Sequence, residues 1–279
     1  MSQEAEVSVG AYWVENQERI EWNVPSQKTD STLPVYRFTV DLSAGDNRLT
    51  YIFRRTHLPI RVDGHANEKS WKSVVQSPKF ASASPSDETH SSVARIVYDE
   101  NFLYVFIQTE DDRVFSYPNS NHEGDRKDDE IKIWIDSDKE SPGYWEFQVD
   151  SRNRLQVSWI TQLGRETLPL KDVGGLHSAV AIGGDRPVNE GWNVEMAIPL
   201  AFVQSKDVTK YDSKPNRIGE HWRLNAMRLG PSFKGEPRNV AWVPFGAPDK
   251  HSLSDMFDGV FADEKGRVNP IGKRDPGFN

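Results

Sequence analysis

The sequence predicts an all-β protein: an antiparallel β-sandwich preceded by a short β extension. Three observations lead to this prediction. Segments that alternate apolar and polar residues recur along most of the chain, Gly, Pro, Asn and Asp separate them, and helical periodicity is scarce. Many short strands with turn signals between them are typical of sandwiches and barrels.

The predicted strands follow one another along almost the whole chain. They are residues 35–42, 47–55, 93–99, 103–111, 130–136, 144–150, 155–162, 178–182, 191–199, 221–229 and 240–245. The first two, joined by 43–47, are predicted to form a hairpin. Short helices or turns are expected only around Asn67–Val75 and Leu200–Val203.

Three regions are expected on this basis. Residues 1–58 are predicted to be an N-terminal β-hairpin extension or the remnant of a preceding domain, and residues 59–263 the sandwich itself. Residues 264–279 carry Pro, Gly and several charges, which predicts a disordered tail.

Composition excludes several classes of function. The net charge of −8 and the pI near 5.4 disfavour nucleic acid as a partner, because phosphate binding needs a basic surface. The absence of Cys excludes disulfides, thiolate metal sites and cysteine nucleophiles. No apolar stretch approaches about 20 residues, so membrane insertion is not expected. The first ten residues lack the pattern of a signal peptide, so an exported form would need a leader outside this sequence.

Strand alternation divides each predicted strand into a core side and an opposite side. Ile131, Ile133 and Ile135 are assigned to the core, which leaves Lys132 and Trp134 on the opposite side. The same treatment of neighbouring strands predicts one polar face. Its members are Lys132, Trp134, Glu146, Gln148, Glu195, Arg223 and Asn225. Hydrogen-bonding groups around an aromatic ring are what a sugar needs, although a solvated outer face would show the same alternation.

The remaining Trp residues and one Arg need separate interpretation. Four Trp residues are assigned to the core and Trp242 to either environment; the four are Trp71, Trp145, Trp192 and Trp222. Arg228 falls on the core side by parity, where its charge needs a partner unless the register is wrong by one residue.

Five blocks, in order, carry a family resemblance. They are IRVDGHANEKSW (60–71), YDENFLYVFIQTEDD (98–112), DRKDDEIKIWIDSD (125–138), EGWNVEMAIPL (190–200) and the closing strands within 221–230 and 241–261. From Leu58 onward the chain resembles carbohydrate-binding module family nine and the wider DOMON-like sandwiches. The resemblance implies a sandwich of immunoglobulin-like jelly-roll type that binds a saccharide without catalysis. It also implies a secreted or periplasmic protein that assists polysaccharide degradation, with a catalytic domain of the parent polypeptide as a candidate partner.

The chain departs from the family at the ligand. Known members hold a terminal sugar between two Trp rings, and at those positions this chain carries Arg126 and His251. A family carboxylate aligns with Lys132, while Arg238 aligns with a sugar-binding Arg and Trp242 adjoins the expected site. The terminal-glucose clamp is therefore not expected, and the choice among mono-, oligo- and polysaccharide stays open.

Aspartates at the ends of neighbouring strands suggest a metal. Asp111, Asp128, Asp129 and Asp136 are predicted to hold a structural calcium ion, which the resembled family often carries. Charged strand ends that prevent edge aggregation are the alternative explanation.

Two other functions are weighed against sugar binding. DOMON-like sandwiches include haem proteins, and Met227 and Lys132 share a predicted face near His251, but haem is the less favoured reading. Glu146 and Glu195 share the predicted face too and would suit the paired carboxylates of a glycan hydrolase or lyase. No other catalytic motif is present, so a binding function without catalysis is preferred.

Overall fold

The computed structural model describes residues 50–81, 92–111, 114, 128–138, 142–183, 191–204, 217–230, 239–244 and 252–268, and the backbone of two short strands at 20–23 and 37–40. The main strands are β3 (Thr50–Arg55), β4 (Ser92–Tyr98), β5 (Phe102–Thr109), β6 (Glu130–Asp136), β7 (Gly143–Asp150), β8 (Leu155–Thr161), β9 (Gly164–Leu168), β10 (His177–Ile182), β11 (Trp192–Pro199), β12 (His221–Leu229), β13 (Val240–Ala241) and β14 (Phe257–Ala262). The helices are short: α1 (Lys69–Lys72), α2 (Leu200–Gln204), and the 3-10 turns η2 (Leu170–Asp172) and η5 (Leu253–Asp255). This content confirms the predicted all-β class.

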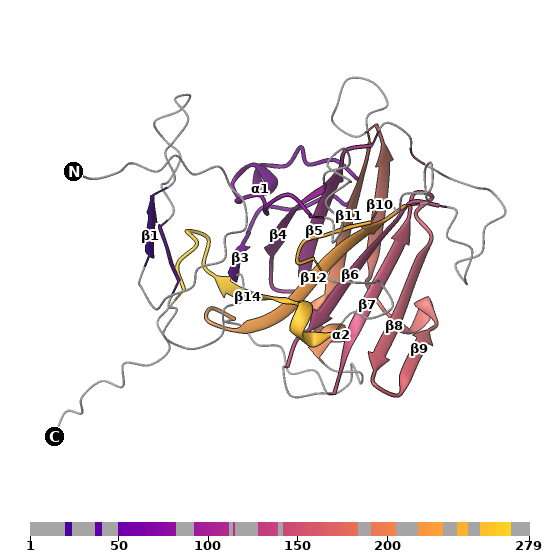
Figure 1. Cartoon of the computed structure of the whole chain (residues 1–279). Helices are drawn as coiled ribbons and strands as arrows, with labels where there is room; N and C mark the ends of the chain where they lie inside the picture. The colour runs from indigo at the N-terminus through magenta and orange to yellow at the C-terminus, as the bar shows by residue number, and fades with distance from the viewer. Residues whose placement is uncertain are drawn as a thin grey trace.

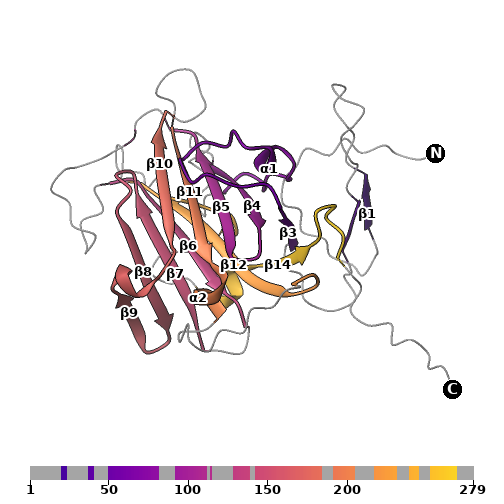
Figure 2. The same ribbon diagram turned by 180° about the vertical axis from the view of Figure 1, so that it is seen from behind.

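The main strands form one curled sheet. Their order is β10-β11-β5-β4-β3-β14-β12-β6-β7-β8-β9, and β13 pairs with β12. Pairing is antiparallel except at β14–β3 and β3–β4, which are parallel. The sheet folds over so that one group of strands (β4, β5, β10, β11) faces another (β6–β9, β12), as two views of the ribbon show (Figures 1 and 2).

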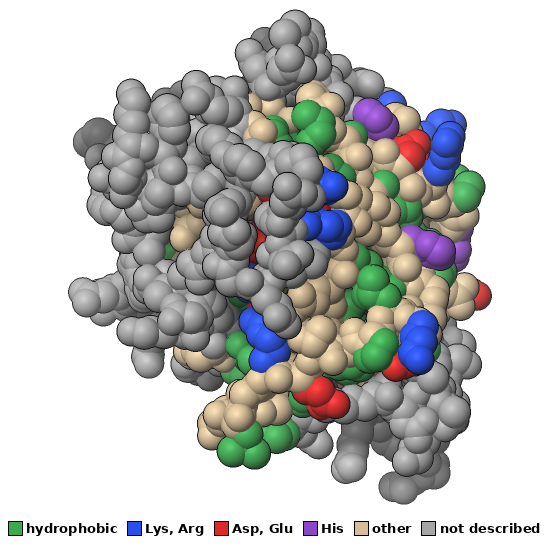
Figure 3. Space-filling view, turned by 90° about the vertical axis from the view of Figure 1, so that its right-hand side faces the viewer, with side chains coloured by type: hydrophobic (Ala, Val, Ile, Leu, Met, Phe, Trp, Pro, Cys, Tyr) green, Lys and Arg blue, Asp and Glu red, His purple; other side chains and the backbone are tan. Residues whose placement is uncertain are grey.

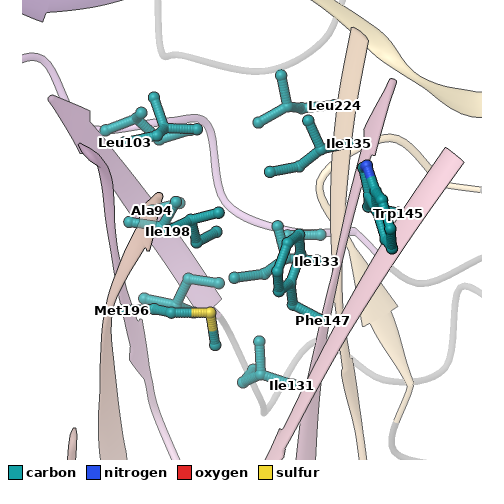
Figure 4. Packing of buried hydrophobic residues seen from close by; sticks show 14 of the residues in the cluster. Ala94, Leu103, Ile131, Ile133, Ile135, Trp145, Phe147, Met196, Ile198 and Leu224 are labelled. Atoms are coloured by element: carbon teal, nitrogen blue, oxygen red, sulfur yellow. The ribbon is translucent and has the colours of Figure 1, made fainter. Parts of the chain in front are cut away.

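The core lies between the two groups of strands. Figure 4 shows Ala94, Met196 and Ile198 of the first group opposite Ile133 and Phe147 of the second. The parity predicted for β6, β7, β11 and β12 is therefore confirmed. Each group also has an outer face that points away from this core.

The first outer face is covered by another segment of the protein. We call it the β11 face; it is the side of β4, β5 and β11 that carries Val97, Phe106 and Glu195. Residues 60–74, including α1, lie on it, and Trp71 packs there against Phe106 with ring centroids 5.7 Å apart. Trp71 is thus buried, as predicted, but outside the main core.

Two predictions about the N-terminal region are wrong. β2 (Arg37–Val40) pairs with β1 (Ile20–Asn23) and not with β3. β3 lies between β14 and β4 in the main sheet, so the sandwich begins before residue 59. The parallel partners of β3 are distant in sequence, and hairpin patterns do not report such pairs.

The C-terminal end is partly described. Ala262 ends β14, and Glu264 contacts Arg54 and His57 at the end of β3. Most of the predicted disordered tail, from residue 269, lies outside the described residues. Within the described part, no helix is long and apolar enough to cross a membrane.

Candidate functional site

Strand register assembles much of the predicted polar face on the second outer face. We call this the β6 face; it is the outward side of β12, β6, β7, β8 and β9. Pairing aligns Met227, Lys132, Gln148 and Gln156 in one row across four strands. The neighbouring row contains Asn225, Trp134, Glu146, Ser158 and Thr167.

Trp134 does not present its ring to solvent. Its side chain is 1% exposed and packs in a second apolar cluster with Tyr144, Met227 and Met256. Leu253 of η5 covers part of the same cluster. The prediction of an open stacking ring is wrong, because segments from the C-terminal part of the chain fold over this part of the β6 face.

Glu146 is the centre of a polar network. It accepts a hydrogen bond from Trp134 Nε1 at 2.9 Å, and both terminal nitrogens of Arg165 contact its carboxylate. Lys132 Nζ lies 3.6 Å from Glu146 Oε2. Burial alone would raise the pKa of Glu146, but Lys132, Arg165 and the indole N–H outweigh it and hold the pKa below its ordinary value.

Lys132 and Gln148 keep unused hydrogen-bonding capacity. Gln148 is 4% exposed; within the described part of the chain its side-chain amide makes no hydrogen bond, and its polar atoms are not among the fully enclosed unpaired ones. Lys132 is 14% exposed at the side chain, and the 3.6 Å contact with Glu146 is too long for a good hydrogen bond. Buried amides are normally paired, so this row is suited to an added polar partner.

Asn225 and Trp242 are enclosed by other parts of the protein. The Asn225 amide donates to the carbonyls of Val243 and Asp255 at 3.0 and 2.7 Å and accepts from Val243 N at 3.0 Å. Trp242 packs in the main core against Phe257, with ring centroids 4.1 Å apart. Asn225 therefore fixes the segments that close over Trp134, and neither side chain is open to a ligand.

Glu195 lies on the β11 face, away from the other predicted residues. It is fully buried and accepts hydrogen bonds from Asp63 N at 2.8 Å, Gly64 N at 3.0 Å and Trp71 Nε1 at 3.0 Å. Burial raises its pKa to about 7 against the lowering effect of these donors. Sequence parity placed Glu195 outward correctly, but it did not reveal that the two groups of strands turn their outer faces in opposite directions.

That geometry separates the two carboxylates proposed for catalysis. Glu146 points outward from β7 and Glu195 outward from β11, with the main core between the two groups of strands. Paired glycosidase carboxylates flank one bond, about 5 to 10 Å apart. Glu146 and Glu195 do not form such a pair. The axial residue of the haem alternative, Met227, is buried in the cluster around Trp134.

The four predicted calcium ligands do not converge. Asp128 and Asp129 precede β6, and Asp136 ends it, which separates them by roughly 20 Å at about 3.3 Å per residue. Asp136 lies 3.7 Å from Arg223, whereas Asp111 and Asp129 both contact Arg228. The buried ion pair required for Arg228 by its parity is confirmed.

Some site residues were missed and others are not described. Arg165 and Gln156 extend the β6 face toward β9, a polar strand that alternation did not predict. The only feature of the sequence that could have indicated β9 is its content of long polar side chains. Arg126, Arg238 and His251 lie outside the described residues, so their predicted ligand roles remain predictions.

The molecule is therefore a curled β-sandwich with one outer face covered and the other lined by polar side chains. A family model described as "Carbohydrate family 9 binding domain-like" matches residues 62–220, more than half of the 279 residues. The chain belongs to this family. Its matched region runs from the block on the β11 face to the turn before β12.

Solved structures share the fold. A candidate carbohydrate-binding protein from Bacteroides uniformis is 14% identical, with a TM-score of 0.61 over 77% of this chain and 100% of that chain. A family nine carbohydrate-binding module from Caldicellulosiruptor kristjanssonii, in complex with cellotriose, is 13% identical, with a TM-score of 0.56 over 80% of this chain and all of that one. A family nine carbohydrate-binding module from the same organism, in complex with glucose, is 13% identical, with a TM-score of 0.54 over 79% of this chain and 100% of that chain. The search of curated proteins gave no match.

Proposed function

We propose that this chain binds a saccharide without bond making, through the part of the β6 face around Lys132, Gln148 and Gln156. Family membership supports carbohydrate as the ligand, and the open hydrogen-bonding capacity of Lys132 and Gln148 supports the place. Sugar hydroxyls both donate and accept, which suits an amide beside an ammonium group.

The network around Glu146 gives this surface a fixed shape. Arg165 and Trp134 hold the Glu146 carboxylate in place, and Lys132 is drawn toward it. Lys132 lies next to Gln148 in one row, and Glu146 belongs to the adjacent row. A site whose side chains are already held loses less conformational entropy on binding. Glu146 thus acts as a positioning group for Lys132.

One side of the molecule is mixed in charge. Figure 3 shows this side, where basic and acidic side chains are dispersed over the described part of the surface and do not gather in one patch. Such a surface favours recognition by hydrogen bonds over bulk attraction of a charged polymer. A neutral saccharide is the partner that this surface suits.

A glycan array, followed by titration calorimetry, tests the proposal. Glucose and cellotriose are the first probes, because modules of similar fold were solved with them. Gln148→Ala and Lys132→Met are expected to weaken binding about five- to tenfold, the scale of one hydrogen bond. Lys69→Ala, an exposed residue of α1 on the other outer face, is the matched control and should leave affinity unchanged. If all three variants bound as tightly as the wild type, the proposed location of the site would be wrong. If the wild type bound no glycan, the proposed function would be wrong.

We further propose an exported accessory role in polysaccharide degradation, which rests on the family alone. Co-purification with, or fusion to, a glycan-degrading catalytic domain is the expected observation. Retention of the protein in the cytoplasm of its source cell, shown by fractionation, would argue against it.

A further inference from the structure

One arginine closes the turn between β7 and β8. Arg154 Nε contacts Asp150, and another nitrogen of the same guanidinium contacts Asp128 before β6. Asp150 also accepts backbone N–H bonds from Arg152 at 3.0 Å and Arg154 at 2.8 Å. Asp128 and Asp150 are buried, and Arg154 is 29% exposed at the side chain. The turn and the start of β6 are therefore joined through one guanidinium.

A second arginine joins the two groups of strands. Arg228, near the end of β12, is fully buried and contacts Asp129 at 3.0 Å. The same Nη2 atom contacts Asp111, which follows β5 in the opposite group. Arg228 pairs with Ile131 in the register, so it lies on the core side at one end of the sandwich.

The two sets of contacts adjoin through the consecutive residues Asp128 and Asp129. The end of β5, the start of β6, the end of β7 and the end of β12 all meet there, and each arginine lies between two aspartates. We call the set the arginine clamp; it consists of Asp111, Asp128, Asp129, Asp150, Arg154 and Arg228.

Three of the four aspartates predicted to bind calcium belong to the clamp. Calcium takes six to eight oxygen ligands at about 2.3–2.6 Å, and it competes for the same carboxylate oxygens. Here guanidinium groups already contact these oxygens, and the fourth predicted ligand, Asp136, lies at the other end of β6. The donor set does not fit a calcium ion at this place.

We propose that Arg154 and Arg228 do the work of a structural cation at this end of the sandwich. Each guanidinium neutralises and links two carboxylates from different strands, which is what an ion between strand ends would do. Arg154 uses two nitrogens of its planar guanidinium fork, which fixes direction as well as charge, whereas Arg228 bridges its two carboxylates through Nη2 alone. The clamp therefore holds β5, β6, β7 and β12 together through covalently attached cations.

Thermal unfolding with millimolar CaCl2 or EDTA tests this assignment. Arg154→Gln leaves Asp128 and Asp150 buried without their shared cation and should lower Tm by roughly 5–15 °C. Arg61→Gln is the matched control, because Arg61 is 85% exposed at the side chain and loses only a 3.7 Å contact with Asp63. It should shift Tm by much less. An unchanged Tm for Arg154→Gln would overturn the proposal.

A second variant guards against failure of Arg154→Gln to fold. The wild-type protein and Asp128→Asn are compared for the Tm change between EDTA and CaCl2. A calcium-dependent rise in the wild type that disappears in Asp128→Asn would overturn the proposal, since Asp128 would then serve the ion. No rise, or a rise of equal size in both proteins, supports it, because any bound calcium would then lie elsewhere.

Discussion

The two outer faces of the sandwich begin from the same sequence pattern and end in different states. Both carry outward polar residues at alternate strand positions, including Glu195 on the β11 face and Glu146 on the β6 face. On the β11 face, residues 60–74 cover the strands and supply every hydrogen bond that Glu195 accepts. On the β6 face, the partners of Glu146 come from other strands of the same sheet, β6 and β9. Polar alternation therefore marks an outer face, but the segments that fold over a face decide where its polar groups find their partners.

The sharpest test of this contrast is Trp134→Ala. Trp134 lies on the β6 face yet is covered, so its removal should leave a cavity and cost about 3–5 kcal/mol of the free energy of unfolding. Chemical denaturation measures the loss. A stability change within about 0.5 kcal/mol, the scale of an ordinary surface substitution, would show that the ring is exposed and that the β6 face is open over Trp134 as well.

Gly64→Ala tests how closely the covering segment fits the β11 face. Gly64 has φ of 84°, and an added Cβ would lie 2.8 Å from Ala181 N on β10. Both the positive φ and the short contact oppose a side chain, so the expected cost is about 1–3 kcal/mol. Gly175→Ala is a useful control: it also has positive φ, but its nearest neighbour would be 3.6 Å away. Equal losses at the two positions would mean that φ alone matters and that the segment does not press on β10.

The two faces also show which features the sequence predicts and which it does not. Alternation placed Ile133, Phe147 and Met196 in the core correctly, because a strand has only two sides and burial selects the apolar one. It did not show that Ala241, Leu253 and Met256 pack around Trp134, since these contacts join positions distant in the chain. The parallel pairing of β3 was missed for the same reason. Fold class was thus accessible from local pattern, whereas the state of each outer face was not.

Glu195→Gln tests the electrostatics of the covered face through pH. The folded-state pKa of Glu195 is raised to about 7 from 4.5, so its contribution to stability is full below about pH 4.5 and is lost as pH rises through 7. In the wild type this residue should lower the free energy of unfolding by up to about 1.4 kcal/mol per pH unit between those values. The difference between wild type and Glu195→Gln, measured by denaturation from pH 5 to 8, should follow this slope. A difference independent of pH would show that the three N–H donors keep the carboxylate ionised throughout.

The smallest expected effect is that of Arg165→Met on the β6 face. Arg165 is 41% exposed and reaches Glu146 from the edge strand β9, so solvent screens much of its interaction. Glu146 keeps Lys132 and the Trp134 indole, and a partly exposed pair contributes about 0.5–1 kcal/mol at most. Chemical denaturation should show a loss of this size in the free energy of unfolding. Saccharide binding should also weaken, because Lys132 moves toward the freed carboxylate. A loss several times larger would mean that Arg165 supports the β6 face as residues 60–74 support the β11 face, and the contrast between the two faces would no longer hold.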